Sequence, residues 1–368
     1  MRIAFVTSCL EPRCDGVGDY TTLLAQECAR HGHDVTCIAL NDPFIKQSVE
    51  SERLARFSSH TPWRDRAKRA RAVLETFAPD WISLQFVCYG FHPRGFSGGV
   101  NPFFNKIFAG WPLQVFFHEL WLGENCGAPR KERAFGWLQR RGVLAMLRSL
   151  APRLVHTSNE AYVHLLGLRG ITARRLPLFG PLPLPDAAPV RKPGTLTFCL
   201  FGTLHPIWPP EPLFSHLRAF DLRVTFAHAG RIGSGEALWS RMEREYRGAI
   251  SFRRLGELPP QEIANFFASC DFGIATTPWA IIGKSASVAA MIDAGLPVIV
   301  NRDDIQFSGF DAPAPDHPLL LRMEEDLPDQ LFTTAREAPR LRLPEIADQF
   351  LADWAAHRSA SALNDCAR

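Results

Sequence analysis

Two glycines between an apolar run and a helical pattern form the first segment with chemical potential. Gly16 and Gly18 lie between the predicted strand Ile3–Val6 and a helix predicted over Thr21–Arg30. Glycines let the backbone come close to a ligand, and a helix N-terminus favours anionic groups, so we predict that both glycines approach a phosphate. Asp19, in the same segment, is a candidate catalytic residue.

This segment does not match the dinucleotide-binding fingerprint. Thr21 stands where the pattern G-x-G-x-x-G requires its last glycine. A plain turn between a strand and a helix is the alternative interpretation of the segment.

His118 is the main candidate for chemistry at a second strand end. It directly follows the apolar run Leu113–Phe117. An imidazole at the carboxyl end of a strand can donate or accept hydrogen bonds to sugar hydroxyls near neutral pH. Glu119 is a further acid/base candidate, and a structural, hydrogen-bonded histidine is the alternative.

Gly283, Lys284 and Ser285 together predict an anion site in the carboxy-terminal half. A phosphate-binding Walker loop is excluded, because Pro278 stands where that motif needs a glycine. A glycine, a cation and a hydroxyl at a helix N-terminus still favour an anion. Lys284 is therefore the best candidate for a diphosphate contact, and an exposed lysine before a capping serine is the alternative.

Other predicted strand ends in this half add weaker candidates. Gly202 and Thr203 follow one strand, and Arg231, which can hold phosphate oxygens bidentately, follows another. Glu257 and Leu258 precede a helix, where the backbone can contact a nucleobase edge.

No metal site is predicted. His31 and His33 flank a turn glycine, Gly32, so their side chains are expected to point apart. We expect this segment to end a helix rather than to bind a metal. The nine cysteines contain no C-x-x-C pair and their number is odd, which fits reduced thiols in the cytoplasm.

Short apolar runs alternate with helical patterns along the chain, which is typical of parallel sheets in α/β folds. The further predicted strands are Val35–Leu40, Trp81–Phe86, Arg153–Thr157, Leu196–Phe201, Arg223–Ala229, Ile250–Phe252, Phe272–Thr276 and Pro297–Asn301. The further predicted helices are Ala161–Leu168, opened by a Thr157–Glu160 capping box, Pro260–Ser269, Ser285–Ala294 and Leu343–Ala356.

The predicted organisation is two doubly wound Rossmann-like domains facing a cleft. They comprise residues 1–180 and 195–342, joined by a proline-rich linker over 181–194. Residues 343–368 form a last helix that can pack back across the cleft, with a frayed tail after Arg358. In such sheets ligands bind beyond the carboxyl ends of the strands, where the candidate residues lie.

Composition indicates an ordinary globular protein. The 368 residues are 46% hydrophobic and 21% charged, and neither a signal peptide nor a membrane span is expected. The net charge of +3 is uneven, since residues 1–180 hold 23 Lys and Arg against 15 Asp and Glu, a balance of +8. Nucleic-acid binding is not predicted, because no recognised motif supports it.

Two basic helical patterns, Arg64–Arg71 and Arg130–Arg153, leave the localisation open. The second alternates aromatic and aliphatic residues with arginines, so it can lie on an anionic membrane surface. Core packing on one face with solvated charge on the other is the alternative. The expected localisation is cytoplasmic, either free or peripheral on the inner face of the membrane.

These motifs, in this order, resemble family 4 retaining glycosyltransferases of the GT-B fold. The resemblance rests on Gly16–Thr21 with His31–Val35, on His118, on Val155–Ser158, and on Leu255–Leu258, Cys270–Ala275 and Ala289–Val298. It implies that the first domain binds an acceptor and the second a nucleotide-sugar donor, with retention of anomeric configuration. It implies no cofactor and no metal.

The resemblance also assigns roles. Gly16 and Gly18 would approach the donor phosphates, and His118 would contact the transferred sugar. The segment Gly256–Leu258 would contact the base, and the diphosphate would rest on the helix start at Gly283–Ser287.

The sequence departs from that family in the donor domain. The paired glutamates of the family fall near Ile282 and Ala290, and neither position is acidic. The usual arginine and lysine after the first strand of this domain are replaced by Thr203 and the Pro209–Pro210 region. Lys284 is hypothesised to compensate for these losses.

The predicted function is transfer of a sugar from a nucleoside-diphosphate sugar to a saccharide or lipid-linked acceptor, which the basic first half suggests is anionic. Two alternatives stay open: a catalytically silent GT-B protein that binds a nucleotide or glycan, and a sugar-nucleotide epimerase.

Overall fold

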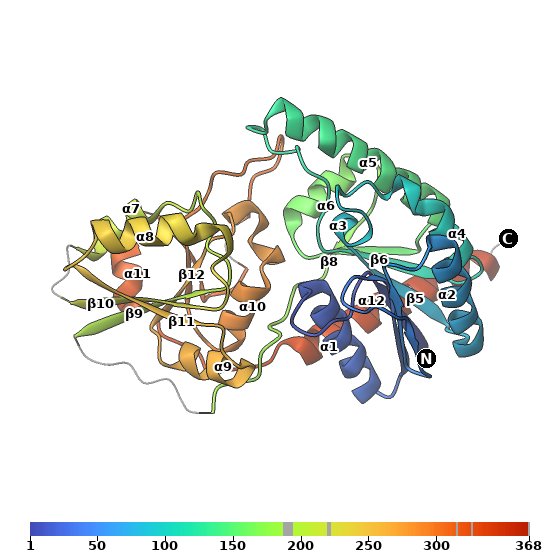
Figure 1. Ribbon diagram of the computed structural model, residues 1–368, viewed down its shortest axis with the longest axis horizontal. Coiled ribbons are helices and arrows are strands. Elements are labelled where there is room, and N and C mark those ends of the chain that lie inside the picture. Colours follow the sequence, from blue (N-terminus) through green and yellow to red (C-terminus); the bar gives the residue numbers. More distant parts are fainter. Residues whose placement is uncertain (187–193, 219–221, 314–315, 325–326, 367–368) are drawn as a thin grey trace. The chain divides into compact units, whose positions relative to one another are not determined.

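The computed structural model describes residues 1–186, 194–218, 222–313, 316–324 and 327–366. The chain divides into two compact α/β units, each with its own sheet (Figure 1). The first unit comprises Met1–Pro177, Phe307–Phe310 and Leu343–Arg368, and the second comprises Leu178–Gln306 and Asp311–Arg342.

The first unit is built on an eight-stranded sheet of order β3-β4-β2-β1-β5-β6-β7-β8. Its neighbouring strands are parallel except for β3 and β4. The strands are β1 (Arg2–Thr7), β2 (Asp34–Asp42), β3 (Val49–Glu50), β4 (Leu54–Ser58), β5 (Trp81–Phe86), β6 (Leu113–Phe117), β7 (Leu154–Thr157) and β8 (Arg174–Arg175).

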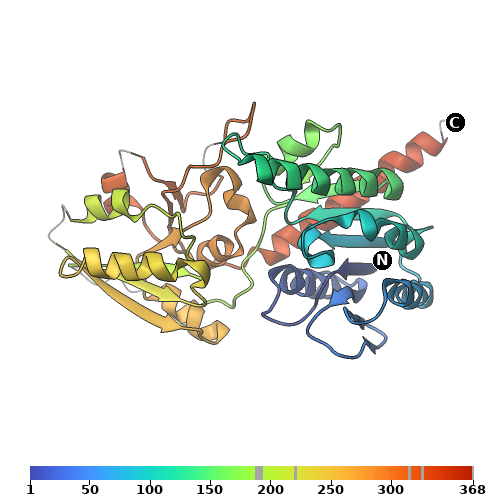
Figure 2. The same ribbon diagram turned by 45° about the horizontal axis from the view of Figure 1, so that its top comes forward.

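The helices of this unit include the last one of the chain. They are α1 (Gly16–Arg30), α2 (Trp63–Phe77), α3 (Cys88–Phe91), α4 (Asn101–Phe108), α5 (Arg130–Leu150), α6 (Glu160–Gly167) and α12 (Leu343–Cys366), with a 3₁₀ turn η1 (Ser97–Gly99). Figures 1 and 2 show α12, in red, beside α1, in dark blue.

Aromatic side chains of α12 cover one face of the first sheet. The rings of Trp81 and Trp354 stack with centroids 4.2 Å apart, and Phe350 lies 5.1 Å from Trp81 and 5.9 Å from Phe5. Tyr20 of α1 packs on Phe116 of the same face at 5.4 Å. This face is therefore closed by the first and last helices of the chain together.

The opposite face is covered by helices from the middle of the unit. Phe86 of β5 stacks on Phe91 of α3, which meets Phe104 of α4 edge to face at 5.1 Å. Trp63 of α2 packs against the same Phe104. Burial on both faces explains why β1 is a continuous apolar run from Ile3 to Val6.

The second unit contains a six-stranded parallel sheet of order β11-β10-β9-β12-β13-β14. Its strands are β9 (Thr195–Phe201), β10 (Arg223–Ala229), β11 (Ile250–Gly256), β12 (Phe272–Ala275), β13 (Val298–Val300) and β14 (Leu320–Arg322). Its helices are α7 (Pro210–Leu217), α8 (Glu236–Glu245), α9 (Pro260–Ala268), α10 (Ala286–Asp293) and α11 (Leu327–Thr333), with 3₁₀ turns η2 (Gly233–Gly235) and η3 (Trp279–Lys284).

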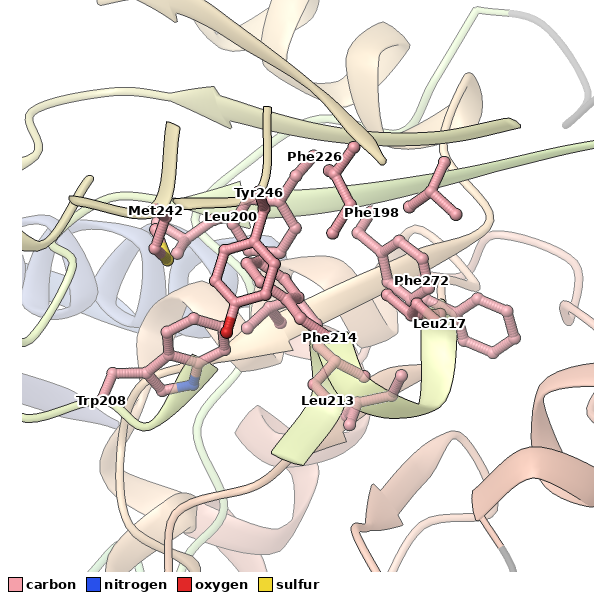
Figure 3. Packing of buried hydrophobic residues seen from close by; sticks show 14 of the residues in the cluster. Phe198, Leu200, Trp208, Leu213, Phe214, Leu217, Phe226, Met242, Tyr246 and Phe272 are labelled. Carbon is pink, nitrogen blue, oxygen red and sulfur yellow. The ribbon is translucent and has the colours of Figure 1, made fainter. Parts of the chain in front are cut away.

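Two apolar clusters hold this sheet between its helices. Figure 3 shows one cluster, in which strand residues such as Phe198 and Phe226 pack on Phe214 of α7 and on α8. The other cluster joins the opposite face to α9 and α10, and Met291 lies so close to Gly273 that a side chain there would collide with it. The second unit is therefore doubly wound.

The predicted strands are confirmed to within a few residues, and α9 and α10 are likewise close to their predicted ranges. β11 is longer than predicted, since it continues to Gly256. Residues 181–186 of the predicted linker run along the second unit, where Gln261 of α9 donates to the Leu184 carbonyl (3.0 Å). Residues 187–193 of that linker lie outside the described residues.

Helix boundaries were predicted less accurately, and α2, for example, ends at Phe77 rather than at Arg71. α1 begins at Gly16 because Asp15 caps it, its side chain accepting from the Val17 amide at 3.1 Å. The cap of α6 is Asn159 rather than Thr157, whose hydroxyl donates to the Phe117 carbonyl instead. α12 continues to Cys366, so a helix replaces the tail expected after Arg358.

Candidate functional site

In the first unit, α1 starts at the carboxyl end of β1, as the glycine segment predicts. The structure gives Gly18 a packing role, because a Cβ there would lie 2.5 Å from the carbonyl oxygen of Cys9. Gly16 has open space around its Cα. The close backbone approach that we predicted at Gly18 is therefore made to the protein itself, whereas Gly16 remains accessible.

Asp15 and Asp19 both bond to backbone near this helix start. Asp15 caps the helix, and the Asp19 carboxylate accepts from the Arg13 amide at 3.0 Å. Burial raises the pKa of both carboxyl groups, against these backbone hydrogen bonds. Asp19 is thus a local structural carboxylate as well as a candidate for chemistry.

His118 lies at the end of β6, as predicted, and its ring is held between aromatic side chains. The Tyr20 ring meets it edge to face at 4.9 Å, and Phe116 lies 4.4 Å away. Its Nε2 is 2.9 Å from Oε1 of Gln85 on β5. Burial, without a charged partner, lowers the pKa of His118 to about 3.

The His118 imidazole is therefore neutral, which limits the chemistry it can perform. At physiological pH the ring has one donor and one acceptor nitrogen, so it can hydrogen-bond to a hydroxyl but does not carry positive charge. Glu119 follows it, half-buried, at the same edge of the sheet.

In the second unit, three strand ends meet around Thr203. The hydroxyl of Thr276, after β12, donates to the Thr203 carbonyl at 3.0 Å. Arg302, after β13, donates to the Thr276 carbonyl at 3.0 Å and is held bidentately by Asp304. Gly202 has φ +81°, which favours glycine where the chain turns out of β9.

Lys284 belongs to a basic cluster at this edge, together with His205 and Arg302. Burial is the largest cause of the lowered pKa of His205, and the charges of Arg302 and Lys284 lower it further, while Asp304 opposes them. The charges of Lys284 and Arg302 therefore both act on His205 at the carboxyl edge of the second sheet, and Asp304 offsets part of the charge of Arg302.

Ser285 is the N-cap of α10, the helix that follows Lys284. Its hydroxyl accepts from the Val288 amide at 3.4 Å and lies 3.0 Å from the hydroxyl of Ser287. The Ser285 hydroxyl is thus used in the cap, and its role toward a phosphate stays a prediction.

Arg231 and Glu257 form an exposed ion pair at 2.9 Å, with side chains 68% and 65% accessible. They follow the adjacent strands β10 and β11, so the structure brings a predicted phosphate contact and a predicted base contact together. Exposed pairs of this kind contribute about 0–1 kcal/mol, and the pair can open at little cost. Leu258 is half-buried against the α9–α10 cluster.

His205 and Arg302 were not predicted as site residues. Arg302 follows β13 by two residues and His205 follows β9 by four, as Lys284 follows β12 at longer range. A search of all cationic residues just beyond predicted strands would have found them.

Two further properties bear on the site. The described residues contain no group of three or more His, Cys, Asp or Glu side chains placed to hold a metal ion. Within the same described part of the chain, no helix combines the length and apolar character needed to cross a membrane.

No protein-family model matches the sequence, and no curated protein matches it. Its fold, in contrast, matches solved structures over nearly its whole length. HepE of Anabaena in complex with UDP aligns with 100% of both chains (TM-score 0.57, 14% identity), and the apo form of the lipopolysaccharide outer core galactosyltransferase WaaB aligns with 95% of both (0.55, 12%).

A third similar structure is the catalytic domain of starch synthase IV from Arabidopsis thaliana bound to ADP and acarbose. It covers 99% of this chain and 98% of its own, with a TM-score of 0.53 and 11% identity. At such identities the likeness shows the fold alone. The chain therefore has an α/β fold with two parallel-sheet domains, the GT-B fold of glycosyltransferases.

Proposed function

We propose that this protein is a glycosyltransferase that moves a hexose from a nucleoside-diphosphate sugar to an acceptor, with retention of anomeric configuration. The observation that carries the proposal is that the charges of Lys284 and Arg302 act at the carboxyl edge of the second sheet, where Arg302 also joins the loops after β12 and β13 through the Thr276 carbonyl. Ligands of open parallel sheets bind at this edge, and a diphosphate is the donor group that positive potential favours.

In this proposal Lys284 and the start of α10 hold the diphosphate, with Gly202 and Thr203 lining the same edge. Lys284 supplies the charge that the missing Arg and Lys of the related family would supply. The leaving diphosphate is stabilised electrostatically as the glycosidic bond breaks. No divalent metal is needed, so a chelator is expected to leave the rate unchanged.

The base is proposed to lie at Glu257 and Leu258, after β11. Arg231 changes partner from Glu257 to a phosphate oxygen, which the exposure of their ion pair permits. Uridine is the proposed nucleoside, because HepE was solved with UDP and with UDP-glucose, and α-glucosyltransferase with UDP.

His118 is proposed to contact the transferred sugar through a hydrogen bond, and Gly16 to leave room for the donor. A neutral His118 cannot stabilise an anion by charge, so its contribution is orientation of a hydroxyl. Asp19 and Glu119 remain the candidate acid/base residues of the first unit.

The acceptor is proposed to be saccharide presented at an anionic lipid surface, and α5 is the part of the first unit that would face it. Trp137 and Leu138 are 47% and 48% exposed on this helix, and the Arg141 guanidinium lies 4.8 Å over the Trp137 ring. Exposed apolar side chains among Arg and Lys are typical of helices that lie in the headgroup region.

Vesicle binding tests the acceptor side of the proposal. The protein is expected to cosediment with phosphatidylglycerol vesicles but not with phosphatidylcholine vesicles, and Trp137→Ala is expected to weaken this binding several-fold. Leu168→Ala, also at an exposed apolar position (54%), is the matched control. Equal binding to both lipids, or none, would remove the lipid surface from the proposal.

Release of UDP from UDP-glucose tests the donor side and separates the alternatives. Slow hydrolysis that yields the α-anomer first, followed by proton NMR, supports a retaining transferase. Isomerisation of the donor without release of UDP would instead indicate an epimerase. Binding of UDP without any turnover, with anionic vesicles present as acceptor surface, would indicate a silent binding protein.

A further inference from the structure

A chain of hydrogen bonds between buried side chains leaves His118 and crosses the first sheet. The His118 Nε2–H group meets Oε1 of Gln85 at 2.9 Å. Gln85 in turn donates from Nε2 to the Ser83 hydroxyl at 2.7 Å, two residues back on the same strand. The chain then passes from β5 to β6.

From Ser83 the chain continues to the last helix of the protein. The Ser83 hydroxyl donates to Oε1 of Gln114 at 2.6 Å, and Gln114 Nε2 lies 3.2 Å from Nδ1 of His156 on β7. His156 Nε2 lies 3.0 Å from Oδ2 of Asp353 on α12. Five successive hydrogen bonds thus connect His118 with a carboxylate far along the sequence.

The register of the sheet places all these strand residues on one face. Ser83 pairs with Gln114, and Phe116, two residues on from Gln114, pairs with His156. This is the face that α1 and α12 cover with aromatic rings. Each of the four side chains between His118 and Asp353 is fully buried, at 0% exposure: Ser83, Gln85, Gln114 and His156.

Polar side chains at these positions are not required by the fold. Strands buried on both faces are normally continuous apolar runs, and an unpartnered polar group there is costly. A connected set in which every member is satisfied is tolerated and fixes a single arrangement. This chain of hydrogen bonds therefore indicates a role beyond packing.

The carboxylate fixes the direction of the first bonds. Asp353 can only accept, so the His156 ring donates to it from Nε2. His156 Nδ1 must then accept, and the partner that donates is Nε2 of Gln114. The amide oxygen of Gln114 is consequently directed away from His156.

The same constraint passes along the rest of the chain. The Gln114 oxygen accepts from the Ser83 hydroxyl, whose oxygen accepts from Nε2 of Gln85. The Gln85 oxygen then requires a donor, which is Nε2–H of His118. His118 Nδ1 is left with its lone pair, and no described residue donates a hydrogen bond to it.

We propose that Asp353 is a positioning residue that holds His118 in the Nε2–H tautomer, with Nδ1 presented as a hydrogen-bond acceptor. Under the proposed function, on which this step rests, Nδ1 accepts a hydrogen bond from a hydroxyl group of the transferred sugar. Asp353 itself is kept in place by Arg174, which donates to its other oxygen at 2.6 Å. The first unit thus uses the last helix to orient its candidate site residue.

The most informative variant is Asp353→Asn, which keeps the shape of the side chain and is expected to reverse the donor–acceptor direction of every hydrogen bond between residue 353 and His118. Arg174 can only donate, so it takes the amide oxygen, and the amide nitrogen then faces His156. His156 must accept at Nε2 and donate from Nδ1, and both glutamine amides turn over. His118 is therefore expected to change to the Nδ1–H tautomer, five hydrogen bonds away from the substitution.

Nitrogen-15 NMR of histidine-labelled protein without ligand measures this directly, because long-range proton–nitrogen couplings distinguish the two ring nitrogens. His118→Gln assigns the His118 signals by their loss. In the wild-type protein we expect the pyrrole-like nitrogen to be Nε2, and in Asp353→Asn we expect Nδ1. A wild-type Nδ1–H tautomer, or an unchanged tautomer in Asp353→Asn, would overturn the inference.

Two further variants show whether the effect travels along the chain. Asp348→Asn makes the same change on α12 at an exposed ion pair with His31, and should leave His118 as it is. Gln114→Leu interrupts the chain, so adding Asp353→Asn to it should no longer alter the His118 tautomer. A change of tautomer in that double variant would show that the chain does not carry the effect.

This test stands apart from the test of the proposed function, since it needs no substrate. A reversed tautomer without turnover of any nucleotide sugar would leave the positioning intact and reject the transferase. Turnover with an unchanged tautomer would reject the positioning alone. In an active protein, Asp353→Asn is expected to lower kcat about tenfold or more with the melting temperature retained, which a purely structural carboxylate would not do.

Discussion

At the scale of single residues, burial decides what His118 can do. Its imidazole has no charged partner, and burial alone lowers its pKa to about 3 from an ordinary value near 6.5. The residue type and position predict hydrogen bonds to sugar hydroxyls, and a ring that stays neutral at physiological pH is suited to that role. The sequence places His118 at a strand end and cannot show the aromatic rings around it.

Acidification is expected to destabilise the fold through His118. Below about pH 6.5 the imidazole of the unfolded protein is protonated, whereas that of the folded protein stays neutral until near pH 3. The free energy of unfolding therefore falls as the pH drops through this range, and His118 causes no such loss above it. The slope is about 1.4 kcal/mol per pH unit for one proton. We expect the free energy of unfolding, measured with urea between pH 6.5 and 4.5, to depend less steeply on pH in His118→Gln than in the wild-type protein, by about this amount.

His60→Gln, at an exposed position, is the control for that series. Equal slopes in the wild-type protein and His118→Gln would mean that the folded ring takes up its proton as the unfolded one does. The neutral role argued above would then be wrong.

Gly18→Ala and Gly16→Ala are predicted to differ, although both glycines belong to one motif. The new Cβ at position 18 would meet the backbone oxygen of Cys9 at 2.5 Å and cannot rotate away, so we expect a loss of about 1–3 kcal/mol. At position 16 the space is open, and the change should be within about 1 kcal/mol. Urea midpoints of the two variants measure the difference, and equal losses would contradict it.

At the scale of elements, apolar runs predict the strands well because both faces of each sheet are covered. Helix starts are harder to predict, because several polar residues compete for one cap. Asp15 caps α1 earlier than the glycines suggest, and Thr157 gives its hydroxyl to a neighbouring strand and leaves the cap of α6 to Asn159. Which backbone group a side chain reaches depends on strands that are distant in sequence.

The helix α12 is predicted to be a main source of stability for the first unit. Trp354→Ala removes a fully buried ring stacked on Trp81, and we expect it to cost about 3–5 kcal/mol. Trp137→Ala makes the same change at a side chain that is 47% exposed, and should cost within about 0.5 kcal/mol. Urea unfolding compares the two, and similar losses would show that α12 contributes little.

At the scale of the whole molecule, the repeated strand–helix pattern suffices to predict two doubly wound units, whereas the GT-B fold was expected from the resemblance to family 4 glycosyltransferases. The sequence pattern does not predict that α12 belongs to the first unit. Phe350 and Trp354 indicate that one face of the helix is buried, but not which sheet they pack against. The hydrogen-bond chain to Asp353 was likewise beyond prediction, since its members come from β5, β6, β7 and α12. Likewise, only the structure showed that His205 and Arg302 lie at the same edge of the second sheet as Lys284.

Nucleotide binding at that edge is the central claim, and it predicts selectivity. In a thermal-shift panel of UDP, GDP, ADP, dTDP and CMP near millimolar concentration, UDP is expected to give the largest stabilisation. A nucleotide at 100 times its Kd adds about 2.7 kcal/mol, which moves the midpoint by several degrees. A larger shift with another nucleotide would correct the base, and the donor site itself would stand.

The most direct measurement is a calorimetric titration of UDP into the wild-type protein, Lys284→Ala and Lys106→Ala. Lys106 is an exposed lysine of the first unit and serves as the matched control. We predict that UDP binds the wild-type protein and Lys106→Ala alike, and Lys284→Ala at least about tenfold more weakly, a difference of about 1.4 kcal/mol. Equal affinity of all three proteins, or no binding by the wild-type protein, would contradict a donor site at this edge of the second sheet.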